Sequence, residues 1–239
     1  MAEVSFFVPV YNGESSVKQN LHKMYDFLNK GFRSFELIVV DDNSKDNSRK
    51  IIKEFAKNKK AIKLIEFEKG PTRRENLAQS FLQAKGNIVV FLDLDSIQSL
   101  SAIPELVEEI RKGEDIALGS RYVKGSRIKR RISRRLMSLL YNKFIQFYFN
   151  SKIRDHNCGI KAFKRKKLIE LVKELGYDAS LSRGWFWDAE LLIRAQKKGM
   201  KIIELPVVWH EQRKSSFSLM REIKMVPYIF SFKKKFGKE

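Results

Sequence analysis

Two aspartates separated by one residue, Asp93 and Asp95, directly follow an apolar run at Ile88–Leu92. A run of β-branched and aromatic residues of this length predicts a buried strand. Ligands of open parallel sheets bind beyond the carboxyl ends of the strands, and two acids there can offer oxygen ligands to a divalent cation that also holds phosphate oxygens. Two acids in a turn, without any ligand, are the alternative interpretation of so short a pattern.

Polar residues also stand at the ends of two other predicted strands. The first strand of the chain is followed by Tyr11 and Glu14, and the second runs directly into Asp41 and Asp42. A single acid in such a position is commonly a helix cap. Because the carboxyl ends of parallel strands lie along one edge of a sheet, three such ends together favour a polar cleft that can hold a cation.

Strands and helices alternate regularly along the chain. Predicted strands cover 4–10, 35–40, 62–67, 88–92, 116–120 and 201–208. Predicted helices cover 17–31, the region around 51–56, 73–85, 104–112, 136–149, 166–175 and 185–199, and 155–161 is expected to be a loop or turn. This alternation predicts an α/β fold with a Rossmann-like, mostly parallel sheet flanked by helices. No G-x-G-x-x-G follows the first strand and no G-x-x-x-x-G-K-[ST] occurs, which disfavours dinucleotide binding and P-loop chemistry.

The composition is that of a globular protein. The 239 residues suit one large domain with appendages, and with 43% hydrophobic residues they can form a proper core. Cys158 is the single cysteine, so no internal disulfide is possible and a reducing compartment is expected. It is expected to be a packed residue rather than a nucleophile, and His156 and His210 are expected to be structural rather than metal ligands. The sequence shows neither a signal-peptide pattern nor an apolar run of about 18 residues.

The positive charge is large and unevenly placed. The formal net charge is +20, and residues 116–154 hold eleven Lys and Arg but no Asp or Glu. Such a surface favours nucleic acid, an anionic membrane face or a phosphorylated substrate, although the run 127–135 is also compatible with a solvated surface. The apolar segment 136–149, about 21 Å long as a helix, is shorter than a bilayer core of about 30 Å, so a core helix and membrane contact both remain open. Basic and apolar residues in 213–239 favour an interfacial amphipathic helix over simple packing.

Several motifs in register resemble those of inverting family 2 glycosyltransferases of the GT-A fold. The first group, 8–12, 38–44 and 91–95, resembles the donor-site signatures of that family. The second group, 119–122, 154–163, 188–192 and 204–207, resembles its polyprenyl-phosphate branch, which holds dolichyl-phosphate mannose synthases and dolichyl-phosphate glucosyltransferases. The Asp-x-x-Cys-Gly-x-Lys stretch at 155–161 is closer to the glucosyltransferases.

The resemblance implies a domain organisation and a set of binding residues. Residues 1–212 would form a catalytic domain, with a nucleotide-sugar half at 1–98 and an acceptor half at 99–212, followed by a basic amphipathic helical tail at 213–239. The nucleotide of a UDP- or GDP-hexose would be bound by residues that end the first two strands, namely Pro9, Tyr11, Asn12, Glu14, Asp41 and Asp42. The acceptor phosphate would be bound by Arg121, Arg130 or Arg131, and Ser133.

The resemblance also implies a divalent metal, Mg²⁺ or Mn²⁺, at the two aspartates. Asp93 and Asp95 would face the diphosphate, with Asp95 as the direct ligand. Mannose synthases carry a metal-binding Gln two residues after the second Asp, where this chain has Ile97. Gln98, one position further on, and water are the alternatives for the missing ligand.

The acceptor determines what chemistry the remaining residues must do. A lipid monophosphate is already anionic at neutral pH, so it needs cations rather than a general base, and the arginine fork matches phosphate geometry. We therefore expect in-line displacement with inversion, with Arg121 and Arg130 or Arg131 placing the phosphate. Asp188 and Glu190 would orient or tune the site.

The favoured function is transfer of a hexose from UDP-glucose or GDP-mannose to a polyprenyl (dolichyl) phosphate. The enzyme would be cytoplasmic and attached peripherally to the cytosolic face of a membrane, without a nucleic-acid partner, and a membrane-protein partner stays open. A family 2 transferase acting on a glycan hydroxyl is the first alternative, with Asp188 or Glu190 as the base. A nucleic-acid-binding protein is the second, but it has no use for three acidic strand ends.

Overall fold

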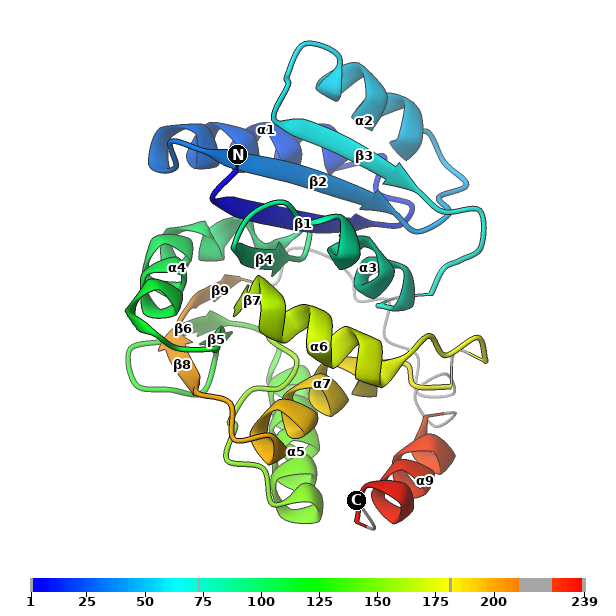
Figure 1. Ribbon diagram of the computed structural model, residues 1–239, viewed down its shortest axis with the longest axis vertical. Coiled ribbons are helices and arrows are strands. Elements are labelled where there is room, and N and C mark those ends of the chain that lie inside the picture. The colour runs from blue at the N-terminus through cyan, green and yellow to red at the C-terminus, as the bar shows by residue number, and fades with distance from the viewer. Residues whose placement is uncertain (1, 73, 181, 211–224, 238–239) are drawn as a thin grey trace.

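The computed structural model describes residues 2–72, 74–180, 182–210 and 225–237, which form a seven-stranded sheet between two layers of helices, with a separate pair of short strands (Figure 1). The strands are β1 (Val4–Val10), β2 (Phe35–Asp41), β3 (Ile62–Glu66), β4 (Ile88–Leu92), β5 (Ile116–Ser120), β6 (Arg127–Lys129), β7 (Ile160–Lys164), β8 (Ile202–Pro206) and β9 (Val208–His210). The α-helices are α1 (Val17–Gly31), α2 (Ser48–Ala56), α3 (Glu75–Ser80), α4 (Ile103–Lys112), α5 (Ile132–Phe149), α6 (Arg165–Leu175), α7 (Phe186–Lys197) and α9 (Val226–Phe236). Two 3₁₀ helices, η1 (Phe81–Gln83) and η2 (Ser96–Ala102), complete the described elements.

The main sheet has the strand order β3-β2-β1-β4-β7-β5-β8. Neighbouring strands in this sheet are parallel except for β7, which runs antiparallel to both β4 and β5. β6 and β9 form a separate parallel pair. The order places β1 between β2 and β4, the three strands whose ends carry the donor-site motifs.

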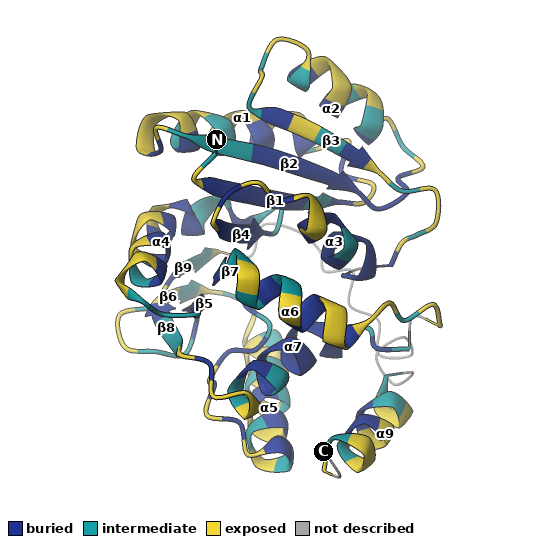
Figure 2. Ribbon diagram, viewed as in Figure 1, coloured by how far each residue is buried: buried dark blue, intermediate teal, exposed yellow. Residues whose placement is uncertain are grey.

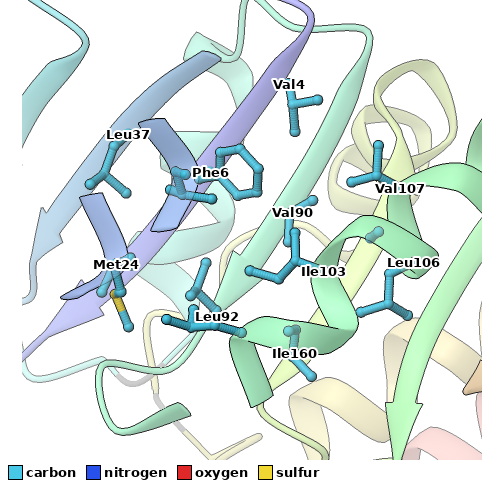
Figure 3. Close-up of a cluster of buried hydrophobic side chains, with 14 of the residues drawn as sticks. Val4, Phe6, Met24, Leu37, Val90, Leu92, Ile103, Leu106, Val107 and Ile160 are labelled. Carbon is cyan, nitrogen blue, oxygen red and sulfur yellow. The ribbon is translucent and has the colours of Figure 1, made fainter. Parts of the chain in front are cut away.

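Both faces of the sheet are buried, which explains why its strands are continuous apolar runs. Successive side chains of a strand point to opposite faces. In β4, Val90 and Leu92 pack in the core shared with α1, α2 and α4, whereas Val89 and Phe91 pack in the core shared with α3, α6 and α7. Figure 3 shows the first of these cores, and Figure 2 shows the buried strands between helices whose outer faces are exposed.

A third apolar cluster joins α5, α7 and α9 at the end of the molecule that is drawn at the bottom of Figure 1. The rings of Phe149, Phe186 and Phe232, one from each helix, have centroids 5.5 Å apart in every pair. The described part of the predicted tail is therefore packed on the preceding helices. Residues 211–224 and 238–239 lie outside the described residues, and the domain boundary at 212 stays a prediction. Among the described helices, none is both long and apolar enough to cross a membrane.

The predicted fold is confirmed, with differences in several elements, and β6 and η2 were not predicted. The expected loop 155–161 is wrong at its end, because β7 begins at Ile160 and pairs with strands far away in the sequence. The helix expected over 73–85 is shortened to α3 and the turn η1, and α5 begins four residues earlier than 136–149. The strand expected over 201–208 is divided after Pro206, since β8 pairs with β5 and β9 pairs with β6.

Candidate active site

The carboxyl ends of β1, β2 and β4 lie at one edge of the sheet, as the order of elements predicted. Val10 at the end of β1 is paired with Asp41, and the amide of Asp42 donates a hydrogen bond to the carbonyl of Val10 at 2.8 Å. Asp93 directly follows β4, the neighbour of β1 on its other side. The two acidic motifs therefore flank the end of β1.

The consecutive aspartates after β2 have different partners. Asp41 is fully buried and accepts a hydrogen bond from Arg49 Nε at 2.5 Å. Asp42 accepts hydrogen bonds from the amide of Thr72 at 2.7 Å, from its hydroxyl at 2.9 Å and from Asn76 Nδ2 at 2.7 Å. Asp41 therefore fixes the turn after β2, and Asp42 faces the connection between β3 and α3.

Side chains of the turn after β1 tie it to the turn after β2. Asn12 has a left-handed backbone, with φ of 48°, and its side-chain oxygen accepts a hydrogen bond from a backbone amide of the second turn at 2.8 Å. Glu14 accepts from the backbone amide of Asn47 at 3.1 Å and from its side-chain amide at 2.8 Å. Pro9 is half-buried within β1 and Tyr11 is exposed. Asn12 and Glu14 thus hold the turns in place, and the nucleotide contacts expected of this region stay predictions.

A buried arginine, Arg74, links the first aspartate of the Asp-x-Asp pair to helix α7. Its Nη1 and Nη2 donate to the two carboxylate oxygens of Asp93 at 2.8 and 3.3 Å, and its Nε donates to Asp188 at 3.0 Å. The other oxygen of Asp188 accepts from Lys161 Nζ at 2.8 Å. Both cations also lie 5.0 Å from the ring centroid of Phe91. Together these residues form an alternating row of charges, Asp93–Arg74–Asp188–Lys161, which we call the charge row.

Asp188 is held in its ionised form within the charge row. Burial alone would raise the pKa of Asp188, but the charges of Arg74 and Lys161 outweigh burial and lower that pKa below its ordinary value. Burial would likewise lower the pKa of Arg74, and the charges of Asp188 and Asp93 raise it instead. Because a proton on Asp188 would weaken two buried ion pairs, this carboxylate is a poor general base and a good orienting group.

Asp95 and Asp93 offer oxygen ligands of the kind that Mg²⁺ and Mn²⁺ prefer. Asp95 is half-buried and lies at the start of η2. The described residues contain no group of three or more His, Cys, Asp or Glu that would hold a metal. Mg²⁺ is usually bound by one or two carboxylates together with substrate phosphates, so the residues fit a cation that enters with a diphosphate. Ile97 packs against the first core, and Gln98 or water as a substitute ligand stays a prediction.

Arg121, at the end of β5, is paired with Asp155 inside the protein. Its Nε and Nη2 donate to the two oxygens of Asp155 at 2.7 Å each, and its backbone amide donates to the same carboxylate at 2.9 Å. The guanidinium carbon lies 5.4 Å from the ring centroid of Trp209. Burial would lower the pKa of Arg121, but the charge of Asp155 raises it. This pair joins β5 to the segment before β7, and contact of Arg121 with an acceptor phosphate stays a prediction.

The other predicted phosphate contacts lie where the basic segment enters α5. Arg130 is half-buried, Arg131 is the N-cap residue of α5, and Ser133 is exposed in its first turn. This segment follows β6, which pairs with β9, and β9 accepts a hydrogen bond at its Val208 carbonyl from Ser99 Oγ of η2 at 2.7 Å. The basic segment is therefore connected to η2, the helix that directly follows Asp95, although its phosphate contacts stay predictions.

Comparisons with known proteins establish the family and the fold of this chain. The family described as glycosyl transferase family 2 matches residues 5–172. The chain belongs to this family. Glycosyltransferase AglD of Haloferax volcanii is 33% identical over 226 residues, which are 92% of this chain and 35% of the relative. Dolichyl-phosphate beta-glucosyltransferase of Saccharomyces cerevisiae is 29% identical over 90% of this chain and 69% of the relative, and dolichol-phosphate mannosyltransferase of Pyrococcus furiosus is 28% identical over 85% and 55%. The chain thus spans about a third of AglD and no more than 69% of the other two.

Solved structures share the fold of this family 2 chain. Glucosyl-3-phosphoglycerate synthase from Mycobacterium tuberculosis in complex with Mn²⁺ and UDP-glucose has a TM-score of 0.70 at 18% identity, covering 96% of this chain and 77% of that one. The mannosyltransferase PcManGT from Pyrobaculum calidifontis in complex with GDP-mannose and Mn²⁺ has a TM-score of 0.65 at 20% identity, covering 99% and 64%. The GT-A fold expected from the motifs is confirmed.

Glu190 lies two residues after Asp188 on α7, and in this family 2 chain it has a separate role. Residues two apart on a helix point in different directions. Glu190 is fully buried and accepts hydrogen bonds from Arg194 Nε at 3.0 Å and from Tyr228 Oη of α9 at 2.8 Å, with Arg183 Nε at 3.1 Å. It therefore anchors the C-terminal helix rather than joining the charge row.

His156 and Cys158 have structural environments, as expected. His156 Nδ1 lies 2.8 Å from Asn142 Oδ1, which can only accept, so Nδ1 carries the proton and Nε2 accepts from Ser151 Oγ at 2.9 Å. Burial lowers the pKa of His156 to about 4 and raises the pKa of the Cys158 thiol to about 12. The histidine fastens α5 to the segment before β7, and the cysteine is a packed thiol.

Three residues of the site were not singled out from the sequence. Arg74 carried no signal beyond being a cation in a basic chain, and Lys161 belongs to the Asp-x-x-Cys-Gly-x-Lys stretch but was given no role of its own. Gly159 belongs to a recognised motif, but its role is visible only in space: a Cβ at this position would lie 2.3 Å from Asp93 Oδ2. The backbone of Gly159 also accepts the amide hydrogen bond of Asp93 at 2.8 Å. Glycine is therefore required for Asp93 to occupy its position.

Proposed function

We propose that this protein transfers a hexose from a nucleoside-diphosphate sugar to a polyprenyl phosphate, with inversion, at the cytosolic surface of a membrane. UDP-glucose and GDP-mannose are the candidate donors. Its relatives in yeast and Pyrococcus carry the names dolichyl-phosphate beta-glucosyltransferase and dolichol-phosphate mannosyltransferase. These names support a polyprenyl phosphate as the acceptor.

The observation that carries this proposal is that both candidate general bases are buried and paired with other side chains. A hydroxyl acceptor needs a group that takes its proton, and the acids expected for that role were Asp188 and Glu190. Asp188 is buried between Arg74 and Lys161, and Glu190 is buried beneath α9. A phosphate acceptor has no need of such a base, because its oxygen is already anionic near neutral pH.

The donor half of the site supports binding of a nucleotide diphosphate. Asp42 and the turns after β1 and β2 would contact the nucleotide, and Asp95 would hold Mg²⁺ or Mn²⁺, with Asp93 beside it facing the diphosphate. When bound, the cation stabilises the negative charge of the leaving diphosphate. The charge row fixes the position of Asp93 beside it. The arginines that lead into α5 would bring the acceptor phosphate to the side of the sugar opposite the diphosphate.

The exposed face of α5 supports a position on a lipid surface. Large apolar side chains recur along this helix and remain exposed, namely Ile132, Leu136, Met137, Leu140, Phe144 and Phe147. Phe147 keeps 89% of its surface accessible and Leu140 keeps 61%. Exposed apolar patches rimmed by charge mark interaction sites. Arginines at the start of α5 and the three lysines Lys233–Lys235 in the last turn of α9 provide charge that complements anionic lipid headgroups.

Product analysis tests the reaction. The protein is incubated with labelled UDP-glucose or GDP-mannose, Mg²⁺ or Mn²⁺, and either a short-chain polyprenyl phosphate or an oligosaccharide. We expect a hexosyl-phosphoryl-polyprenol of the corresponding mass with one donor, and Asp95→Asn is expected to abolish its formation. Transfer to the oligosaccharide but not to the lipid phosphate would overturn the proposal in favour of a glycan hydroxyl acceptor.

Vesicle flotation tests the surface. Wild-type protein is expected to float with vesicles that contain anionic phospholipid, and Phe147→Glu or Leu140→Glu is expected to reduce the bound fraction about tenfold, since a charge on the apolar face opposes insertion. Leu82→Glu is the matched control, because Leu82 is 47% exposed on η1, a different element. Equal binding by all three variants and the wild type would refute the role of α5.

A further inference from the structure

Arg74 holds both carboxylate oxygens of Asp93 while being almost completely buried itself. Its side chain is 7% exposed, and that of Asp93 is 27% exposed. Charge-assisted pairs in which two N–H groups meet two oxygens have a fixed geometry. The negative charge of Asp93 at the edge of the sheet is therefore already compensated by Arg74, before any metal ion binds.

We propose that Arg74 is a positioning residue that keeps Asp93 out of the metal's coordination, leaving Asp95 as the direct carboxylate ligand and making retention of the cation depend on the bound diphosphate. This inference rests on the proposed function, and it concerns a residue that the sequence motifs did not identify. A guanidinium next to the site repels a divalent cation and uses the oxygens that a second ligand would need. The phosphates of the nucleotide then supply the oxygen ligands that Asp93 cannot provide while it is paired with Arg74.

The surroundings make the role of Arg74 separable from the rest of the fold. Removing its charge leaves Asp188 still paired with Lys161 at 2.8 Å. The backbone of Asp93 is held independently, because its amide donates to the carbonyl of Gly159 at 2.8 Å. Replacement of Arg74 by a neutral residue thus releases the carboxylate of Asp93 without moving the main chain that carries it.

The experiment measures Mn²⁺ binding directly, by electron paramagnetic resonance of the free ion, with UDP or GDP and without nucleotide. For wild-type protein we expect Mn²⁺ to bind at least about tenfold more tightly in the presence of the nucleotide that the enzyme accepts. For Arg74→Gln we expect binding without nucleotide to tighten about tenfold, since Asp93 becomes available as a ligand.

A double-mutant cycle assigns the effect to Asp93. Asp93→Asn in the wild-type background is expected to change Mn²⁺ affinity less than about twofold, whereas in the Arg74→Gln background it should reverse the gain. Arg74→Lys keeps the charge and is expected to keep the wild-type nucleotide dependence. Near-ultraviolet circular dichroism identifies any variant that does not fold. If Arg74→Gln does not fold, the comparison of Asp93→Asn with Asp95→Asn in the wild-type background carries the test.

Two results would overturn the inference, and only the second would also count against the proposed function. If Asp93→Asn weakens Mn²⁺ binding by wild-type protein as much as Asp95→Asn does, Asp93 is a direct ligand and the role of Arg74 is wrong, although the proposed function stands. If wild-type protein binds no Mn²⁺ with either nucleotide, both the inference and the metal-dependent part of the proposed function fail.

Discussion

The substitution Gly159→Ala tests how much catalysis depends on the position of Asp93, because it displaces the carboxylate without replacing it. The added Cβ would lie 2.3 Å from Asp93 Oδ2 and 2.9 Å from its carboxyl carbon. Ordinary C···O contacts are no closer than about 3.3 Å, so the carboxylate must move by roughly 1 Å. The backbone of Gly159 is not in the left-handed region, so the effect arises from this overlap and not from backbone strain.

A displacement of this size is expected to disrupt the charge row. The bonds from Arg74 to Asp93 measure 2.8 and 3.3 Å, and hydrogen bonds weaken beyond about 3.2 Å. Misplacement of a site group by about 1 Å can reduce the rate on the order of 100-fold. We therefore expect kcat for hexose transfer to fall about 100-fold in Gly159→Ala at saturating donor and acceptor.

Two other glycines provide matched controls. A Cβ at Gly119 would also overlap, at 2.5 Å from Val207 Cγ1 and 2.6 Å from Ile160 Cγ2, but it would meet apolar side chains of the core rather than the carboxylate of Asp93. Gly119→Ala is expected to cost about 1–3 kcal/mol in the free energy of unfolding with kcat near the wild-type value. At Gly31 a Cβ meets nothing within 4 Å, so Gly31→Ala should change neither quantity. A Gly159→Ala protein with kcat within about threefold of wild type would refute the reasoning, as would an equal loss of kcat in Gly119→Ala.

Three further predictions concern buried ionisable groups. Burial raises the pKa of Glu75 from 4.5 to about 7, so the stability this group contributes is fully present below about pH 4.5 and is lost as the pH rises through about 7. The free energy of unfolding, measured with urea, should therefore fall by up to about 3 kcal/mol more in the wild type than in Glu75→Gln between about pH 4.5 and 8. A difference between the two proteins that does not change with pH would contradict this. Asp155→Asn leaves the buried Arg121 without its carboxylate and should cost about 3–5 kcal/mol in urea unfolding, whereas a small cost would mean that Arg121 faces solvent or substrate. The Cys158 thiol, with its pKa raised to about 12 by burial, should react with iodoacetamide only in denaturant; rapid reaction of the native protein would contradict its burial.

The alternation of strands and helices along the chain and the sheet edge that carries the acids could be predicted from the sequence, because both follow from local patterns. Continuous apolar runs such as Ile88–Leu92 identify buried strands, and the alternation with helices makes neighbouring strands parallel. The strand β7 could not be predicted in the same way. Its second residue, Lys161, is charged, and a lysine in a strand normally indicates an exposed face. Its burial depends on Asp188, which lies 27 positions away in the sequence.

Arg74 was missed for the same physical reason. At the start of a predicted helix in a chain of net charge +20, an arginine is indistinguishable from the many that are solvated. Its partners Asp93 and Asp188 lie 19 and 114 positions further on. The motifs identified both carboxylates, but the cation between them is determined by how α3, β4 and α7 meet. A sequence pattern can therefore identify the acids of such a site more readily than the residues that compensate their charge.

Residues one or two positions apart at the starts of α3 and α7 connect the site to α9. On α7, Asp188 belongs to the charge row and Glu190 accepts the hydroxyl of Tyr228 from α9. Arg74 directly precedes α3, whose first residue is Glu75. The carboxylate of Glu75 lies 3.2 Å from Arg183 Nη1, and Arg183 Nε donates to the same tyrosine at 3.0 Å. The starts of α3 and α7, which position Asp93 through the charge row, are thus also the parts of these helices that are linked to α9. A change that displaces α9 must either break these buried pairs or move the start of α3. The position of α9 and the geometry at Asp93 are therefore coupled.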